Sequence, residues 1–488
     1  MRVHALSRRL MSPAVAAGLL IFVAWALAEY LAVPVGSVLA GLVRGLELHT
    51  LPLYLLGLSL AVVALWLRPF VGVLILAAAL PVENVFVVPG GTSALKLLGL
   101  LLATVWFLAK LKRGESWTDL FSTPWTIAVP LFIAFVLTSA GWAESSSAAI
   151  NGAIQLCFLF GLALVVADLV RSSERAELLA RALVLGGGYA AYLTIQQSLE
   201  GARRAGEGIS GGGNATASML LVLLPFAFYL LRASQKNLWR FVGLVYLPLS
   251  LAAIAFTYSR MNLLLLPPVL LLLTWQTIRG RRGRALLLGS ALVSVVALSS
   301  FVPWWRMGDR LTTIPQYVTS VMQPEQESLS VYSGRGYHMQ IALAIARDHP
   351  IVGAGYDSYG ALFRDEYQFV VRGAPTLIKS KRSPHSSWLG ILADLGAVGV
   401  LLWSAVLGAA IFLALNAWRR TRSHPMSSSH VLNQTTITCL LLYALPFGFY
   451  FQTQREKLLW VLMGLALAFF RLSKPENDSS RQTTVGLE

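Results

Sequence analysis

The sequence predicts an all-α fold, a polytopic integral membrane bundle of about 12–14 transmembrane helices. Hydrophobic residues make up 56% of the 488-residue chain and charged residues only 13%, and the mean hydropathy is +0.65. Apolar runs of about 17–25 residues, long enough to cross a bilayer, recur from residue 11 to residue 472. Because no soluble segment of comparable size separates these runs, the chain is expected to be built around the membrane.

Each apolar run of spanning length is assigned one helix. The stretch 34–49 after the first run is interpreted as a re-entrant or interfacial piece. The candidate spans are residues 11–33, 50–67, 69–89, 94–110, 124–140, 148–170, 178–198, 215–231, 239–257, 261–278, 285–303, 386–414, 431–451 and 456–472.

These spans divide the chain into four parts. Residues 1–303 hold the N-terminal transmembrane helices, and residues 304–384 form one large periplasmic loop that contains amphipathic helices. Residues 385–472 return to the membrane, and residues 473–488 form a cytoplasmic tail.

The positive charges indicate the orientation. A net charge of +16 would suggest nucleic-acid binding in a soluble chain, but here the basic residues sit in short clusters between apolar runs. With the N-terminus in the cytoplasm, the clusters at 110–113, 279–284 and 419–422 all fall on the cytoplasmic side, as the positive-inside rule requires. The chain is therefore predicted to be a multi-pass membrane protein with no nucleic-acid partner.

The same topology places residues 199–214, 258–260 and 304–384 outside, in the periplasm of a Gram-negative cell. Several arginines then lie on the side where the charge bias does not expect them, and ionisable groups near membrane depth are candidates for function. These arginines are Arg203, Arg204, Arg260, Arg335, Arg372 and Arg382.

Arg260 lies in FTYSRMNLLLLPP, which joins two spans with almost no loop. Its guanidinium must therefore sit at the outer mouth of the bundle. An arginine there can snorkel to lipid phosphates. The hydroxyls of Thr257 and Ser259 favour a polar pocket instead.

Arg335 opens a predicted amphipathic helix. Apolar residues recur at helical spacing from Tyr337 to Ala346, and DHPIVGAG ends the pattern. The glycines of that segment do not form a nucleotide-binding loop, because no strand precedes them. Taken alone, Arg335 is equally well an ordinary exposed cation.

The segment RRAGEGISGGGNATASMLLVLLPFAF is an external glycine-rich loop that leads into a helix at Asn214. Backbone N–H groups of such a loop, with Arg204 beside them, can bind an anion. The alternative is a flexible linker followed by an asparagine cap.

His385, in KRSPHSSWLGILADLGAVGVLLW, stands at the outer mouth of a span. Histidine, with an unperturbed pKa of about 6.5, is a base at neutral pH. His338, three residues after Arg335, ranks second, and His349 is assigned to the helix end. A metal site is not predicted, because neither an HExxH motif nor a His/Asp cluster at ligand spacing is present, and Cys157 and Cys439 are solitary.

Arginines bind phosphate bidentately, so these outer groups suit a site that holds a lipid-linked pyrophosphate and deprotonates an attacking hydroxyl. In order and context over roughly residues 200–400, the chain resembles the O-antigen ligase family, which includes O-antigen polymerases and related oligosaccharyltransferases. The resemblance rests on the loop before Asn214, TYSR at a tight outer turn, SGRGYHMQIALAIARDHPIVGAGYDSYGALF and HSSWLGILADLGAVG.

The resemblance implies an all-helical fold similar to membrane glycosyltransferases that use polyprenyl phosphates. It implies that Arg260 and Arg335 engage the pyrophosphate of an undecaprenyl-linked glycan and that His385 is the base or orients the acceptor. Many members have asparagine after that histidine, where this chain has Ser386, and Asp394 is interpreted as structural support.

The expected function is that of an O-antigen ligase, which transfers a glycan from undecaprenyl diphosphate to a lipid A–core hydroxyl. One inverting displacement, without metal, nucleotide or other cofactor, would suffice. Within the family, a polymerase or a transferase to protein or another polysaccharide is the alternative. Outside it, Pro267 and Pro268 in mid-span keep a lipid-linked glycan transporter open, and a membrane scaffold would leave the outer arginines unexplained.

Overall fold

The computed structural model describes residues 63–87, 93–202, 204–277, 335–367, 383–423 and 427–474, without the side chains of residues 277 and 335–337. Within these ranges the regular structure is helical, apart from one isolated β-bridge between Val87 and Ser93. Seven of the described helical stretches are long and apolar enough to cross a membrane. The predicted all-α, multi-pass membrane fold is confirmed.

Most of the described spans lie within a few residues of their predicted positions. The predicted spans 11–33 and 285–303, the stretch 34–49 and most of 50–67 lie outside the described residues, as do Arg203, Arg372 and Arg382. The matching helices are α5 (Ala94–Lys112), α7 (Pro124–Thr138), α8 (Ser146–Leu169), α9 (Ser173–Leu199), α10 (Gly213–Ala233), α11 (Asn237–Phe256), α12 (Arg260–Thr277) and α20 (Lys457–Leu472).

Two predicted spans are shorter than expected as α-helices. The span 69–89 is α4 (Pro69–Ala79) followed by a 3-10 segment, η1 (Leu80–Val85), because Pro81 has no N–H with which to continue the α-helix. The span 431–451 is α19 (Ser428–Leu442), which passes into a π-helical turn, η5 (Tyr443–Phe447), around Pro446.

The predicted span 386–414 is α18 (Ser387–Arg420), and it is not one continuous helix. Gly396 has φ 62° and ψ −162°, which breaks the helix into residues 387–395 and 397–420. A Cβ at this position would lie 2.3 Å from the Ile351 carbonyl oxygen, so the loop before α17 (Tyr359–Asp365) packs directly against the break. The first two N–H groups after the break donate to the carbonyls of Pro350 (2.9 Å) and Ile351 (3.1 Å).

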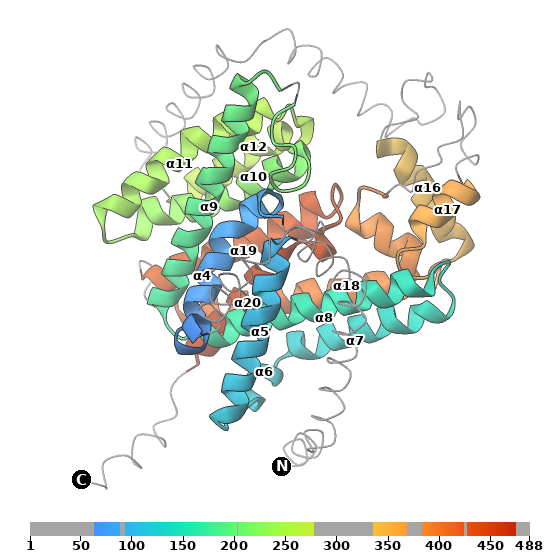
Figure 1. Cartoon of the computed structure of the whole chain (residues 1–488), viewed down its shortest axis with the longest axis horizontal. Helices are drawn as coiled ribbons and strands as arrows, with labels where there is room; N and C mark the ends of the chain where they lie inside the picture. The colour runs from blue at the N-terminus through green and yellow to red at the C-terminus, as the bar shows by residue number, and fades with distance from the viewer. Residues whose placement is uncertain are drawn as a thin grey trace, which may run out of the picture.

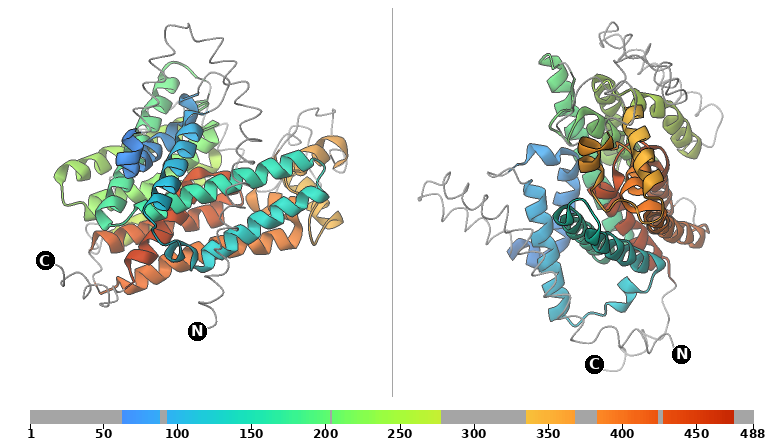
Figure 2. Two further views of the ribbon diagram at one scale, coloured as in Figure 1. Left: turned by 60° about the horizontal axis from the view of Figure 1, so that its bottom comes forward. Right: turned by 90° about the vertical axis from the view of Figure 1, so that its right-hand side faces the viewer.

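Helices α10 and α20 form the centre of the bundle, since most of their side chains are buried. Three tryptophans join α7, α18 and α20, with the ring of Trp460 6.5 Å from the rings of both Trp125 and Trp403. Figure 2 shows α7 and α8 running beside α18 as a long antiparallel pair.

A small helical unit covers the start of α18. It consists of α16 (Arg335–Asp348) and α17, which share a core of their own with Ala393 of α18. Figure 1 shows this unit at the edge of the bundle, beside the beginning of α18. We call it the outer cap.

The helix ends form two groups. At one end, called the His385 end, the Tyr356 N–H donates to Ser139 Oγ (3.1 Å), and Lys457 pairs with Glu83. At the opposite end, called the Arg171 end, Arg171 pairs with Glu115 (2.8 Å) and Lys110 with Asp168 (3.0 Å). The charge pattern of the sequence assigns the helix ends at the His385 end to the outside and those at the Arg171 end to the cytoplasm.

Candidate functional site

His385 lies immediately before α18 with its side chain exposed. Its φ is 52°, in the left-handed region that residues with a Cβ rarely adopt, so neighbouring contacts must hold it there. The Ser387 N–H donates to the Gly448 carbonyl (2.8 Å), and Ser387 Oγ is 2.6 Å from the Phe451 carbonyl. The segment 448–451 therefore anchors the start of α18 and aims the imidazole outward.

His338 of α16 meets His385. The two rings lie edge to face with centroids 5.4 Å apart, and the His338 ring also packs 5.1 Å from Phe363. His338 is 4% exposed, whereas His385 is open to the surface. The outer cap thus brings His338, the second-ranked histidine of the sequence analysis, into contact with His385, the first-ranked one.

Tyr359 of α17 orients His338. Its hydroxyl donates to the His338 carbonyl (3.1 Å) and lies 3.2 Å from Nδ1 of the same histidine. Because the hydroxyl has one proton, Nδ1 must carry the hydrogen of the second bond. Neutral His338 then keeps Nε2 as its acceptor.

Asp394 holds the turn that carries Tyr359. One carboxylate oxygen accepts the Tyr359 N–H (2.9 Å) and the other accepts the Asp357 N–H (3.1 Å). Asp394 is 8% exposed and lies in the short first part of α18. The contacts therefore run from Asp394 through Tyr359 and His338 to His385.

Arg455, which sequence reasoning did not single out, closes this turn from the other side. Its Nε donates to the Tyr356 hydroxyl (3.1 Å), its guanidinium lies 5.1 Å from the centre of the Tyr356 ring, and it pairs with Asp357 (3.2 Å). Burial raises the pKa of Tyr356, with the positive charge of Arg455 acting against it. The sequence signal that could have identified Arg455 is its place in the short loop between the predicted spans 431–451 and 456–472, on the predicted outer side.

A second polar group gathers at the starts of α10 and α12. Arg204 donates to Asn214 Oδ1 and to the Thr257 carbonyl (3.2 Å). Asn262 donates to the Asn214 carbonyl (3.3 Å) and to Ser259 Oγ (2.9 Å). These bonds join the glycine-rich loop to the tight turn before α12.

Arg260 is the first residue of α12 and is half-buried beside this network. The loop before α10 is not a linker ending in an asparagine cap: Gly212 is the N-cap, and Asn214 lies inside the first turn. A Cβ on Gly213 would lie 2.8 Å from the Ala205 carbonyl oxygen, so the loop folds closely over the helix start.

Arg335 is the first residue of α16, one turn before His338. Its side chain lies outside the described part of the structure. The backbone alone places it on the helix that contacts His385.

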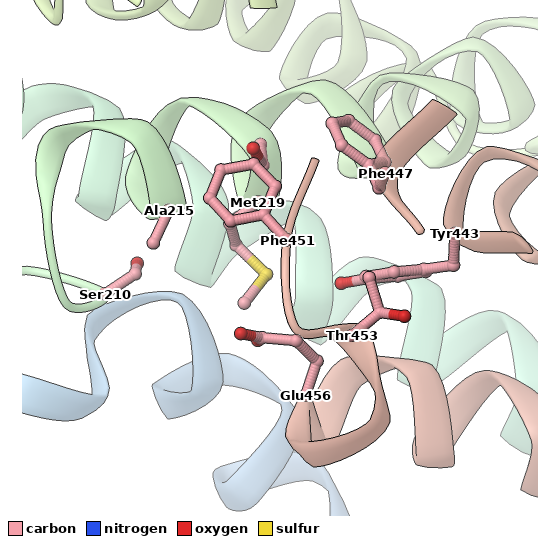
Figure 3. A pocket seen from close by; sticks show the side chains of 9 residues that line it. Ser210, Ala215, Met219, Tyr443, Phe447, Phe451, Thr453 and Glu456 are labelled. Carbon is pink, nitrogen blue, oxygen red and sulfur yellow. The ribbon is translucent and has the colours of Figure 1, made fainter. Parts of the chain in front are cut away.

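A small cavity is lined by the start of α10 and the loop before it on one side and by residues of the segment 443–456 on the other (Figure 3). Its volume of about 20 Å³ is enough for about one water molecule. Ser218, which bonds Asn262 (3.2 Å), lines one wall, and Thr453, which bonds Ser387 (3.0 Å), lines another. The cavity is thus connected to both groups.

Glu456 also lines this cavity, at the start of α20. Burial raises the pKa of its carboxyl to about 7; the negative charge of Glu83 acts in the same direction, and Lys457 acts against it. In the described part of the chain, no group of three or more His, Cys, Asp or Glu side chains could hold a metal ion.

Residues 245–404 match the protein family described as O-antigen ligase. Over these residues the chain is similar to the O-antigen ligase family. The match covers about a third of the chain, and no curated protein matches it.

The matched residues include Arg260, Arg335 and His385, together with Asp394, which holds the turn that carries Tyr359. The match excludes Arg204 and Asn214, and also Arg455 and Glu456. This similarity supports, in the general sense, a glycosyl-transferring enzyme with lipid-linked glycan substrates. An exposed imidazole in contact with a second histidine, on a helix that begins with Arg335, is chemically suited to that reaction.

Proposed function

We propose that this protein is an O-antigen ligase that acts at the periplasmic face of the bacterial inner membrane. Its donor is a glycan on undecaprenyl diphosphate, and its acceptor is a hydroxyl of lipid A–core. The observation that carries the proposal is the contact between His338 and His385, because it holds a titratable ring at the mouth of α18 beside the helix that begins with Arg335.

The reaction is one displacement at the anomeric carbon. The acceptor oxygen forms the new glycosidic bond while the bond from that carbon to the phosphate oxygen breaks. His385 takes the acceptor proton and becomes imidazolium, and the electron pair leaves on undecaprenyl diphosphate. Inversion follows because no covalent enzyme intermediate forms.

Arg260 and Arg335 neutralise the charge that grows on the leaving pyrophosphate. Donors already in position when charge develops stabilise the transition state more than the ground state. Arg204 and Asn214 support this role indirectly, since their bonds hold the turn that ends at Arg260. The step needs neither nucleotide nor metal, because the donor bond is already activated.

The first test is the glycan profile of a strain that lacks the gene. Polymerised glycan stranded on the lipid carrier beside bare lipid A–core supports the ligase. Single repeat units in place of long chains would instead support a polymerase, in which His385 acts on a lipid-linked acceptor. Unchanged lipopolysaccharide and undiminished glycosylated protein or exopolysaccharide would contradict the whole proposal.

A second test separates transfer from transport. Purified protein in detergent, with lipid-linked glycan and lipid A–core, should form product although there are no two compartments. Arg335→Ala should lose activity about 100-fold while keeping the unfolding temperature of the wild type. Full activity of that folded variant would contradict the proposed role of Arg335 in binding the leaving pyrophosphate.

A further inference from the structure

The Arg171 end of the bundle, opposite to the end that holds His338 and His385, contains two cavities. Their volumes are about 280 Å³ and 270 Å³, and Leu472 lines both. Together they approach the size of a small-molecule site. Their walls come from the ends of α8, α18 and α20 and the starts of α9 and α19.

The first cavity is basic. Arg171, Arg471 and Lys474 line it, with Asp119 of α6 (Thr118–Phe121) as the one carboxylate among its lining residues. Arg171 and Arg471 are positioned by backbone carbonyls, at 3.0 Å from Asp168 and 2.9 Å from Ala167. The Lys474 ammonium lies 5.4 Å from the centre of the Phe470 ring. Arg171 also pairs with Glu115 (2.8 Å) and Asp168 (3.4 Å), and Arg471 with Asp168 (3.8 Å), so these carboxylates offset part of the positive charge. The lining side chains themselves are three cations and one carboxylate, which favours an anion.

The second cavity lies at two helix N-termini. Ser172 caps α9, and Ser429 lies in the first turn of α19, which Ser427 caps. Ser173 and Ser429 share a hydrogen bond across the seam between these helices. Helix N-termini carry partial positive charge and point N–H groups outward, so they reinforce the preference for an anion.

Asn433 adds an independent observation. Its side chain is 1% exposed and lines the second cavity, and its Nδ2 donates to the Ala414 carbonyl (2.8 Å). Its Oδ1 accepts no hydrogen bond from any described residue. Buried acceptors in native proteins normally have a partner, so a ligand that fills this cavity should bring a donor.

We propose that these two cavities form one site for a phosphate group whose headgroup also carries a hydrogen-bond donor. The phosphate lies among Arg171, Arg471 and Lys474, and the donor reaches Asn433. A phospholipid with a hydroxyl or ammonium headgroup has both features, and helix ends lie at the level of such headgroups. Free phosphate satisfies the first feature only. The inference does not depend on the proposed glycosyl transfer.

The test uses the purified full chain in detergent and measures its unfolding temperature with three probes: phosphatidylglycerol, phosphatidylcholine and inorganic phosphate. Lys474→Gln removes a lining cation. Lys236→Gln removes the same charge from an exposed position outside both cavities, and is the matched control. We expect phosphatidylglycerol to stabilise the wild type and Lys236→Gln equally, and Lys474→Gln to need about tenfold more lipid.

Stabilisation by inorganic phosphate with the same dependence on Lys474, and no further gain from the lipid, would identify free phosphate as the source. Equal lipid dependence of Lys474→Gln and Lys236→Gln would overturn the site. Asn433→Leu tests the donor: it should bind phosphatidylglycerol no better than phosphatidylcholine. If it keeps the preference of the wild type, the donor contact is wrong.

Discussion

His338 and His385 lie edge to face with ring centroids 5.4 Å apart, one buried on α16 and the other exposed before α18. The buried ring is bonded to Tyr359, and the exposed ring is the one that a substrate can reach. Under the proposed function, His385 is the group that reacts and His338 the group that positions it. The predictions below test this division of roles and the parts of the fold that maintain it.

His385→Ala should reduce the rate of glycosyl transfer about 10²–10⁴-fold, the range for loss of a general base. His338→Phe should reduce it about tenfold, because only the orientation of His385 is impaired. The pH–rate profile distinguishes the two roles. The acidic limb, where the rate falls as the base becomes protonated, should vanish in His385→Ala and persist, displaced, in His338→Phe. Equal losses with identical pH profiles would contradict the division.

Tyr359→Phe removes the hydroxyl that bonds the His338 carbonyl and ring. We expect a loss of about 1 kcal/mol in unfolding free energy and a several-fold lower transfer rate. Tyr189→Phe is the matched control, since that side chain is 47% exposed. Chemical denaturation and transfer assays on both variants give the comparison, and a rate equal to that of the control would show that Tyr359 does not act through His338.

Gly396→Ala should destabilise the protein by more than about 1 kcal/mol, because its φ is 62° and a Cβ would lie 2.3 Å from the Ile351 carbonyl oxygen. Gly408→Ala in the same helix has nothing within 4 Å of the added Cβ and should be neutral or slightly stabilising. Unfolding temperatures measured side by side decide this. If the two substitutions behave alike, α18 is not broken at Gly396.

Glu456 should make stability fall as pH rises. Its folded-state pKa is about 7 against an ordinary 4.5, so the folded protein holds the proton more tightly. Its contribution is fully present below pH 4.5 and is lost as pH rises through 7, by at most about 3 kcal/mol. Glu456→Gln should flatten the curve of unfolding free energy between pH 5 and pH 8. If Glu456→Gln leaves the pH dependence of the unfolding free energy unchanged, the Glu456 carboxyl is exposed to water and burial does not raise its pKa.

Arg260→Gln should lower transfer about 100-fold with little change in unfolding temperature. Arg204→Gln should lower both, because Arg204 bonds Asn214 and the Thr257 carbonyl. Measuring transfer rate and unfolding temperature on the same preparations separates a group that binds the donor from one that supports the turn. The assignment of Arg260 fails if its variant loses stability as Arg204→Gln does.

The helices of the bundle could be predicted from run length, because α7 to α12 are bounded where hydropathy falls. The break at Gly396 could not. Apart from Asp394, the residues around it, ADLGAVGVLLW, are apolar through the break, and a loop from elsewhere supplies the hydrogen bonds at the turn. Run length also overestimated α4, where Pro81 stops the helix inside an apolar stretch.

The outer arginines and His385 could be selected by topology, which needs only the sequence. Their partners required the tertiary structure. The contact of His338 with His385 depends on a turn fixed by Asp394, and helical spacing within α18 carries no information about that turn. Arg455 and Glu456 lie in a short segment whose importance comes from the side chains packed against it.

The break in α18 makes the outer cap and the start of that helix one mechanical unit. Four backbone hydrogen bonds join residues 350–355 to residues 393–398: from Ala354 to Ala393, from Gly355 to Asp394, from Ala397 to Pro350 and from Val398 to Ile351. Lifting the outer cap away from α18 would break all four bonds together. Residues 350–355 and 393–398 therefore move together, so under the proposed function His338 and His385 are already in contact before the substrates bind.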